Sequence, residues 1–474
     1  MKLLEKTGGF MSSIGKDLRK IVSPEQVLDL IEDVSAYAND ATYYIARKNP
    51  DAVVLAESTA DVSAVLKYAS ANRIPVVPRG AGSGLAGGCT PVHGGIVIDM
   101  KRMNSILEID HRNMTAAVEG GVVLGDFVKK VERMNLFYPP DPQSSQVCTI
   151  GGNIATRAGG PRGVKYGTTE RYVTGVEAVM ADGTVITPGG KVVKQSSGYD
   201  LTHLFTGSEG TLCVITKGML RLLPLPREKR TIVVTCANSD QAAQIVSDVI
   251  ARGAVPAMLE FLVNLAIIAM NNYIKPPIPL NGQAYLMMEI DGSAEQVELE
   301  TREIETVCSE HEAMDVRVIT NPAENNMYWY ARSRLYPLMT TIFKRVITED
   351  ITVPRDKIPE LVRRIQAIGT SIGVGMGLAG HAGDGNMHPT ILQGEISEEL
   401  SQKADRAIEE IIKAGLDLQG TISGEHGIGI HKNRFLELEH GHDQVEIMKT
   451  IKRALDPLNI MNPGKIWTED GGAA

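Results

Sequence analysis

The chain has 474 residues, of which 43% are hydrophobic and 22% charged, and its formal net charge at pH 7 is −9. This length and hydrophobic content predict a globular protein of two or three domains. The acidic balance, spread without long runs of one sign, argues against a polyanionic partner, so we expect no nucleic-acid binding.

The first 50 residues show a helical pattern, in which Val27, Leu28, Leu30 and Ile31 fall on one apolar stripe. We therefore expect a helical lead-in over residues 1–50. The N-terminal segment lacks the apolar run of a signal peptide, and no later segment has the length of a membrane span. These observations predict a cytoplasmic protein with no transmembrane segment.

Short strand-like segments bounded by Gly, Pro and Asp fill residues 51–225 and form two blocks, about 51–110 and 111–225. One helix-like segment, residues 58–73, lies among the strands of the first block. In the second block, residues 175–186 predict two strands joined by a tight turn at Asp182 and Gly183. The pattern is typical of an α+β fold.

Residues 226–420 have a different texture, in which helix-like segments follow β-rich ones. They predict a separate α+β domain, an antiparallel sheet with helices on one face. The segment 421–467 contains a helix with Val445, Met448 and Leu455 on its apolar side, and the helix ends at Asp456. We expect the tail, residues 468–474, to be disordered.

Three glycine-rich loops occur in the first 225 residues. The loop at residues 78–88 contains a GxGxxG pattern, but it runs into a strand, whereas a Rossmann fingerprint must open a helix. Its backbone N–H groups still suit a pyrophosphate. With the loops at residues 141–160 and 207–211, it predicts a site for a long ligand that carries phosphate, ribose and a flat ring.

Two histidines and a glutamate stand in glycine-flanked motifs, with His381 and His388 in GHAGDGNMH and Glu425 in GEHG. This ligand set holds one divalent metal and leaves positions open for a substrate, and Fe²⁺, Zn²⁺ and Mn²⁺ all suit it. The adjacent His426 is a candidate base, so the site is suited to polarising a hydroxyl or carbonyl group. A metal-dependent hydrolase would use the same set, but that interpretation leaves the glycine-rich loops unexplained.

Seven segments carry a family resemblance: PRGAGSGLAGG, DPQSSQVCTIGGNIATRAGG, YGTTERYVTGVEAVMADG, GYDLTHLFTGSEGTLCVIT, GHAGDGNMH, GEHGIG and DPLNIMNPGKIW. Together they resemble the FAD-linked oxidase family of the vanillyl-alcohol-oxidase/PCMH type, in its D-lactate dehydrogenase and glycolate oxidase subunit branch. The resemblance covers about residues 50–467. It implies a PCMH-type FAD-binding domain of two subdomains at 51–225 and a ferredoxin-like α+β cap at 226–420, which holds substrate and metal. It also implies a C-terminal segment, 421–467, that returns to complete the FAD site and the active site.

The resemblance also implies the residues that contact FAD. Some relatives attach the flavin through a histidine in the first loop, where this chain has Gly82 and Ser83, so we expect noncovalent FAD. The expected contacts are Pro78, Arg79, Gly80, Ala81, Gly82, Ser83, Gly84, Ser144, Ser145, Thr149, Gly152, Asn153, Thr156, Gly159, Glu209, Gly210, Ile215 and Asn462.

By the same resemblance, His381, His388 and Glu425 bind the metal and His426 is the catalytic base. Arg332 matches the arginine that holds the substrate carboxylate through paired hydrogen bonds. A helix-surface salt bridge is an equally good interpretation of Arg332, and Arg334 and Arg345 are nearby rivals for the same role.

Two departures from relatives that act on dicarboxylic hydroxy acids narrow the expected substrate. Pro389-Thr390 lacks their asparagine, and Ile347-Thr348-Glu349 lacks their lysine, which favours a small monocarboxylate. We expect oxidation of D-lactate to pyruvate, with electrons passed to an electron-transferring flavoprotein or another redox subunit. The alternative is glycolate or another D-2-hydroxy acid, with electrons passed to iron–sulfur subunits or a quinone. A flavin-bearing electron-transfer subunit with little catalysis of its own is a third hypothesis.

Overall fold

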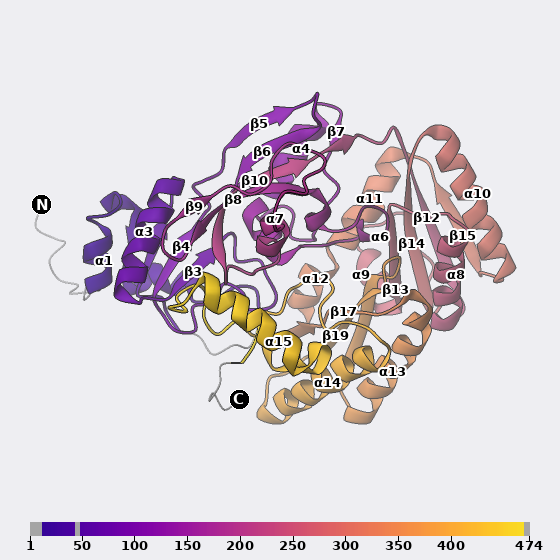
Figure 1. Ribbon diagram of the computed structural model, residues 1–474. Coiled ribbons are helices and arrows are strands. Elements are labelled where there is room, and N and C mark those ends of the chain that lie inside the picture. Colours follow the sequence, from indigo (N-terminus) through magenta and orange to yellow (C-terminus); the bar gives the residue numbers. More distant parts are fainter. Residues whose placement is uncertain (1–11, 43–47, 469–474) are drawn as a thin grey trace, which may run out of the picture.

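The computed structural model describes residues 12–42 and 48–468. The expected disordered tail lies almost entirely outside this range, as does the start of the lead-in. Within the described ranges, no helix combines the length and the apolar character needed to cross a bilayer. The N-terminal half and the C-terminal half lie side by side in Figure 1, and helix α15 runs below the N-terminal half toward the orange helices of the C-terminal half.

A four-stranded sheet forms the first part of the N-terminal half, with the order β1-β2-β4-β3. Its strands are β1 (Val27–Leu28), β2 (Ala52–Leu55), β3 (Val76–Arg79) and β4 (Ile96–Asp99). Helix α3 (Thr59–Asn72) crosses from β2 to β3, and its first turn is capped by Ser58, whose hydroxyl accepts a hydrogen bond from Asp61 N. Strands β2 and β3 both pair in parallel with β4.

The expected helical stripe of the lead-in is wrong at Val27 and Leu28, which lie in a strand. Among the described residues of this segment, 12–42 and 48–50, the helical ones are α1 (Ser13–Leu18), α2 (Ile31–Val34) and two 3₁₀ turns, Pro24–Gln26 and Ser35–Tyr37. Val27 and Leu28 form β1 and pair with Val54 and Val53 of β2. The edge of a buried sheet outweighs local helical spacing because the strand satisfies the backbone groups of β2.

The second part of the N-terminal half is a five-stranded antiparallel sheet with the order β5-β6-β10-β8-β9. Its strands are β5 (Ile106–Asp110), β6 (Thr115–Glu119), β8 (Val173–Met180), β9 (Val185–Ile186) and β10 (Cys213–Arg221). The expected turn between β8 and β9 is present, with Gly183 at φ +83°. Its helices are α4 (Leu124–Glu132), α5 (Ile150–Thr156), α6 (Gly163–Tyr166) and α7 (Leu201–Phe205), and β7 (Leu136–Phe137) pairs with β11 (Leu223–Pro224).

The C-terminal half is built on an antiparallel sheet with the order β15-β12-β14-β13-β18-β19-β16. From here on the name cap is used for residues 226–435, which are the expected cap (226–420) together with the loop that carries Glu425 and His426. Its strands are β12 (Glu228–Cys236), β13 (Met258–Val263), β14 (Ala284–Gly292), β15 (Asp315–Ile319), β16 (Arg345–Thr348), β17 (Ile351–Thr352), β18 (Gly375–His381) and β19 (Asn386–Gln393). Strand β14 is buried almost throughout and accordingly reads as a nearly continuous apolar run.

Helices cover both faces of the cap sheet, so the expectation of helices on one face is wrong. The outer face packs against α8 (Ser239–Ala251), α10 (Ala294–Glu310), α13 (Ile358–Ile372) and α14 (Glu398–Asp417). The inner face packs against α9 (Asn264–Met270), α11 (Pro322–Ser333) and α12 (Leu335–Ile342). Successive side chains of a strand point to opposite faces of the sheet, so Ile232 and Val234 point outward and Val233 points inward.

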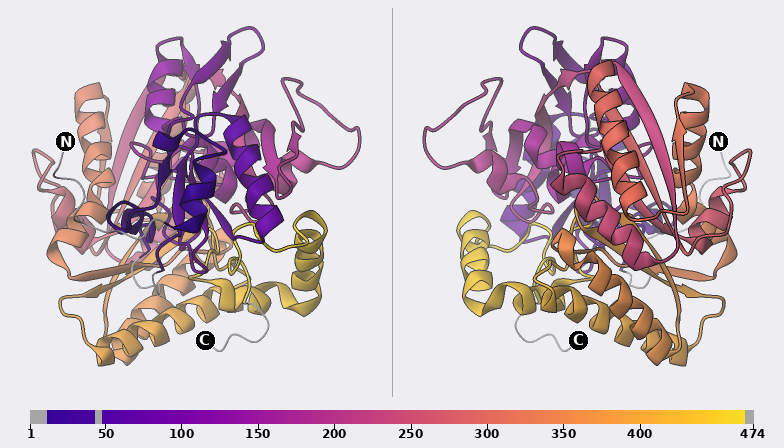
Figure 2. Two further views of the ribbon diagram at one scale, coloured as in Figure 1. Left: turned by 90° about the vertical axis from the view of Figure 1, so that its left-hand side faces the viewer. Right: turned by 90° about the vertical axis from the view of Figure 1, so that its right-hand side faces the viewer.

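The C-terminal segment connects the two halves. Figure 2 shows this yellow segment beside both the purple N-terminal half and the orange helices of the cap. Helix α15 (Leu436–Leu455), kinked at Gly441, packs Ile451 and Leu455 against the core of the five-stranded sheet. Beyond it, Met461 forms a parallel bridge to Val76 at the start of β3. The chain therefore closes on the strand that leads into the first glycine-rich loop.

Candidate active site

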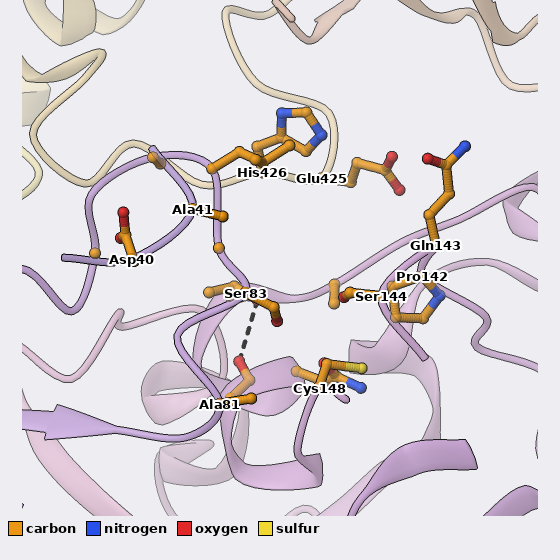
Figure 3. Close-up of a pocket in the computed structure, with 18 of the residues that line it drawn as sticks. Asp40, Ala41, Ala81, Ser83, Pro142, Gln143, Ser144, Cys148, Glu425 and His426 are labelled. Atoms are coloured by element: carbon orange, nitrogen blue, oxygen red, sulfur yellow. Dashed lines mark hydrogen bonds between the residues drawn. The ribbon is translucent and has the colours of Figure 1, made fainter. Parts of the chain in front are cut away.

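A cavity of about 490 Å³ lies between the N-terminal half and the cap. All three glycine-rich loops contribute to one wall, and strands and helices of the cap form the other. Figure 3 shows part of it, with Ala81, Ser83, Ser144 and Cys148 on one side and Glu425 and His426 on the other. The loops therefore enclose a single site.

The first loop presents bare backbone because its side chains have no room. Gly82 has φ +71°, and a Cβ added there would lie 2.1 Å from Arg79 Nη2. A Cβ at Gly80 would lie 2.3 Å from the hydroxyl oxygen of Thr149. Arg79 itself donates a 2.7 Å hydrogen bond to the carbonyl of Asn39, which anchors the base of the loop. Glycine is required here by close approach as well as by a positive φ.

The second and third loops complete this wall. Thr149 caps helix α5 by accepting a hydrogen bond from Gly152 N. In the third loop, the half-buried carboxylate of Glu209 accepts hydrogen bonds from Ile428 N at 2.8 Å and Gly429 N at 2.7 Å. Burial raises the pKa of Glu209, and the two N–H donors partly offset this rise. Glu209 thus ties the cofactor wall to the loop that carries Glu425 and His426.

The structure brings sixteen of the eighteen expected cofactor residues to the cavity, and Ser145 and Asn462 are the exceptions. The carbonyl of Ser145 accepts a hydrogen bond from Gly125 N instead. The side-chain amide of Asn462 donates to the carbonyls of Gly88 and Glu209, so this residue lies behind the wall. The expected direct approach of Asn462 to the flavin ring is therefore not supported by its position.

Sequence reasoning missed the cavity residues outside the motifs. Asp40 and Ala41 lie between β1 and β2, and Tyr336 and Met339 lie on α12. No glycine cluster or histidine marks these positions. For Tyr336 and Met339, the only signal was an apolar helix near Arg332.

The hairpin β18–β19 places His381 and His388 on one face, because His381 pairs with Asn386 and His388 follows two residues later. Glu425 comes from the distant GEHG loop. Its Oε1 lies 3.3 Å from His381 Nε2 and 3.4 Å from His388 Nε2. All three ligand atoms lie within 4.8 Å of one another. A tetrahedral ion with ligands at about 2.1 Å would separate neighbouring ligand atoms by about 3.4 Å, so the set fits a metal.

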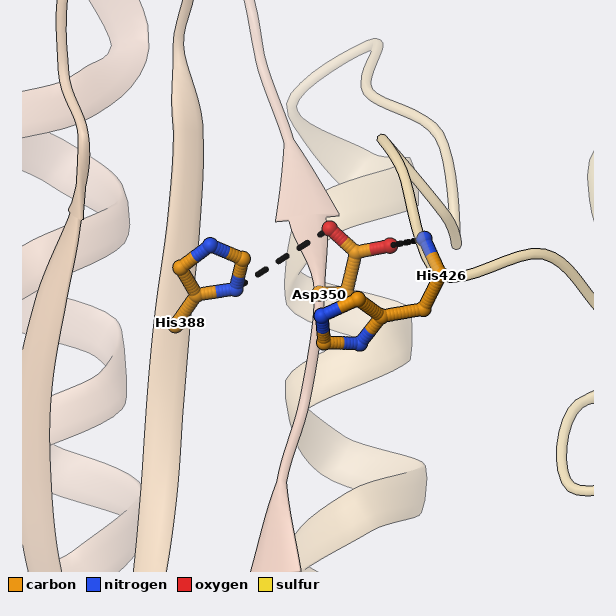
Figure 4. A group of neighbouring side chains, drawn as sticks. All are labelled: Asp350, His388 and His426. Carbon is orange, nitrogen blue, oxygen red and sulfur yellow. Dashed lines mark hydrogen bonds and ion pairs between the residues drawn. The ribbon is translucent and has the colours of Figure 1, made fainter. Parts of the chain in front are cut away.

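Asp350, which sequence reasoning missed, organises the loop of the candidate base (Figure 4). One carboxylate oxygen accepts hydrogen bonds from His426 N at 2.9 Å and Glu425 N at 3.0 Å. The other accepts from the side-chain amide of Asn386 at 2.8 Å. Burial lowers the pKa of His426, which Asp350 partly counters. A neutral imidazole, able to accept a proton, is the consequence.

The rings of His388 and His426 stack 5.4 Å apart at an interplanar angle of 11°. The second set that could hold a metal, Asp350, His388 and His426, shares His388 with the first. Its Asp350 oxygens already accept three N–H groups and the Ser423 hydroxyl. The set with Glu425 is therefore the better candidate.

Arg332 is the only one of the three rival arginines that lines the cavity. It is 4% exposed, which excludes a helix-surface salt bridge. Its Nε donates a 2.7 Å hydrogen bond to Glu260, and its Nη2 also contacts that carboxylate. Arg334 instead lies over the ring of Tyr330, and Arg345 donates to Ser401.

The cavity thus combines a glycine-lined wall with a second α+β domain that closes it, and both parts of this arrangement match known families. Residues 225–466 match the family described as FAD linked oxidases, C-terminal domain, and residues 50–189 match the FAD binding domain. The chain is 40% identical over 457 residues to the glycolate oxidase subunit GlcD of Bacillus subtilis, covering 96% of this chain and 97% of the relative. It is 37% identical over 417 residues to the D-lactate dehydrogenase of Archaeoglobus fulgidus, covering 87% and 90%.

A crystal structure of p-cresol methylhydroxylase with substrate bound matches the fold with a TM-score of 0.81 at 19% identity, covering 99% of each chain. The chain belongs to the FAD-linked oxidase family, in the group of D-lactate dehydrogenases and glycolate oxidase GlcD subunits. This confirms the resemblance found in the sequence. An observation inside the cavity also fits a bound cofactor, because the amide nitrogen of Asn153 is buried there with no hydrogen-bond partner among the described residues.

Proposed function

We propose that this protein oxidises D-lactate to pyruvate and passes the electrons to a partner redox protein such as an electron-transferring flavoprotein. One observation carries the proposal. His381, His388 and Glu425 form a metal-type set at the cap side of the glycine-lined cavity, and the half-buried His426 and the buried Arg332 border the same space. A hydroxy acid between these groups would lie against the flavin wall.

When bound, FAD would supply a hydride acceptor, and a divalent ion held by His381, His388 and Glu425 would supply a Lewis acid that lowers the pKa of the substrate hydroxyl. Arg332 holds the carboxylate of the acid by charge-assisted hydrogen bonds and so orients the Cα–H bond. His426, neutral at pH 7, removes the hydroxyl proton as the hydride leaves Cα. The products are a 2-oxo acid, a protonated His426 and reduced flavin.

The two positions at which this chain departs from relatives that act on dicarboxylic hydroxy acids support a monocarboxylate substrate. Thr348 and Thr390 both line the cavity, and their hydroxyl oxygens lie 3.3 Å apart. Among the described residues that line the cavity, the basic side chains are Arg79, Arg332, His388 and His426. Arg79 belongs to the glycine-rich loop, so Arg332 is left as the arginine for a single carboxylate.

Glycolate is the second candidate substrate, and the 40% identity to a glycolate oxidase subunit favours it. The two acids differ by one methyl group, which a pocket discriminates by only about 1–3 kcal/mol. For this alternative, iron–sulfur subunits or a quinone would take the electrons. The five cysteines are too scattered to hold a cluster on this chain, so electrons leave to a separate acceptor.

The test is an anaerobic titration of the FAD-loaded, metal-loaded protein with D-lactate, L-lactate and glycolate in parallel, following the visible flavin spectrum. Bleaching by D-lactate with the highest second-order rate constant for flavin reduction supports the proposal. A higher rate constant for glycolate selects the second candidate. Bound flavin that neither D-lactate nor glycolate bleaches contradicts both.

A further inference from the structure

Glu260 is a fully buried carboxylate at the point where the candidate metal set and Arg332 meet. It lies on β13, the strand that pairs with β18, in the register Phe261 to Gly380. One residue further along that register, Glu260 comes opposite His381. Its Oε1 contacts His381 Nδ1, and its Oε2 takes the Nε and Nη2 groups of Arg332.

The contact with His381 fixes the state of that imidazole. A carboxylate can only accept a hydrogen bond, so Nδ1 of His381 must carry the proton. In the neutral ring, the lone pair then lies on Nε2, the atom that points to Glu425 at 3.3 Å. A carboxylate behind a histidine also raises the basicity of its other nitrogen toward a metal.

The contact with Arg332 holds the guanidinium that borders the cavity. The Nε and Nη2 groups of Arg332 and the Nδ1 group of His381 all converge on this one buried carboxylate. Its two oxygens are divided between the two partners. One buried charge therefore supports both the histidine and the arginine.

We propose that Glu260 is a positioning residue that couples metal binding by His381 to carboxylate binding by Arg332, an inference that rests on the proposed function. A shared support means that a single substitution weakens both interactions. The hydrogen bonds that Glu260 makes with described residues go to His381 and Arg332, and none goes to a glycine-rich loop. FAD binding should therefore not depend on Glu260.

The experiment compares Glu260→Gln with wild type, both loaded with FAD and stripped of metal. Titration with Mn²⁺ and with Zn²⁺ gives the dissociation constant, and D-lactate turnover at saturating metal gives KM and kcat separately. We expect metal affinity to fall by about 10- to 100-fold, the usual effect of removing such a partner. KM should rise by more than kcat falls, and the FAD content should be unchanged.

Glu289→Gln is the matched control. Glu289 is a buried glutamate on the neighbouring strand β14, in register with Met258, and its nearest cation is Lys229 at 3.4 Å. This variant should keep the metal affinity of wild type. If Glu260→Gln does not fold, the double variant Glu260→Gln, Arg332→Gln removes both members of the buried ion pair and should show the same loss of metal affinity.

The outcomes separate this inference from the proposed function. If Glu260→Gln binds metal as tightly as wild type or keeps its KM, the positioning role is overturned and the proposed function stands. An equal loss in Glu289→Gln would also overturn the role, because any buried carboxylate would then suffice. If wild type binds neither ion, the metal site of the proposed function fails with it.

Discussion

The two walls of the cavity are built in different ways. The wall from the N-terminal half offers backbone N–H groups, small side chains and glycines with positive φ such as Gly82 and Gly210. The wall from the cap adds titratable side chains, which buried carboxylates hold in place. Arg332 and His381 share Glu260, and the loop of His426 is held by Asp350.

The difference reflects what each wall has to bind. Backbone groups can recognise a pyrophosphate through shape, and glycine lets the chain approach it closely. Proton and hydride transfer need charges at fixed positions, and a buried charge is stable only with a partner. Changes in the cap wall should therefore alter chemistry with FAD retained, whereas changes in the loop wall should alter FAD affinity.

Removing the metal should have the largest effect. Treating the FAD-loaded protein with a chelator should slow flavin reduction by D-lactate on the order of 10⁴-fold, because a Lewis acid contributes several kcal/mol. Anaerobic stopped-flow absorbance measures the rate, and the flavin content should be unchanged. Adding Mn²⁺ or Zn²⁺ back should restore it. Full reduction in metal-free protein would show that the histidine–glutamate set has another purpose.

The substitution His426→Gln removes the proposed base from the cap wall. Flavin reduction should slow by about 10³-fold, within the usual range for general-base catalysis, with FAD still bound. His442→Gln is the control, because His442 lies exposed on α15. A wild-type rate in His426→Gln would remove this residue from the proton-transfer step.

Arg332→Lys tests the carboxylate contact. The lysine keeps the charge but loses the paired geometry, so KM for D-lactate should rise by roughly 10- to 100-fold, the equivalent of one charged hydrogen bond. Steady-state kinetics measures the change. Arg334→Lys, outside the cavity and over Tyr330, should leave KM within about threefold of wild type. Equal effects in both variants would point to altered packing of α11.

Gly82→Ala breaks the loop wall and should have the smallest effect. A Cβ there would lie 2.1 Å from Arg79 Nη2 and would shift the loop backbone that faces the cavity, so FAD should bind roughly tenfold more weakly, the equivalent of about 1.4 kcal/mol. Fluorescence titration of the apoprotein measures the affinity, and the reduction rate of the FAD-saturated variant should stay near wild type. Gly198→Ala carries a similar φ of +83° with no atom within 4 Å and should not change FAD affinity. A slower reduction rate in Gly82→Ala at full FAD occupancy would contradict the division of roles between the walls.

The sequence by itself determined the loop wall and the metal-type residues. Gly80, Gly82 and Thr149 stand in local motifs whose conformation depends on near neighbours, and all three line the cavity. His381 and His388 lie seven residues apart on one hairpin, so their shared face follows from strand periodicity. Such features are local, and local features can be predicted from a single chain.

Only the tertiary structure decided which side chains support that chemistry. Glu260 and Asp350 lie far along the chain from His381 and His426, and no motif marks them. The choice of Arg332 over Arg334 and Arg345 depends on how α11 packs against the cap sheet, and Asn462 lies behind the wall because its amide bonds Gly88 and Glu209. Val27 and Leu28 form a strand because they pair with β2, more than twenty residues further along the chain. Each of these outcomes depends on burial and pairing between distant segments, and the spacing of residues along one segment carries no record of them.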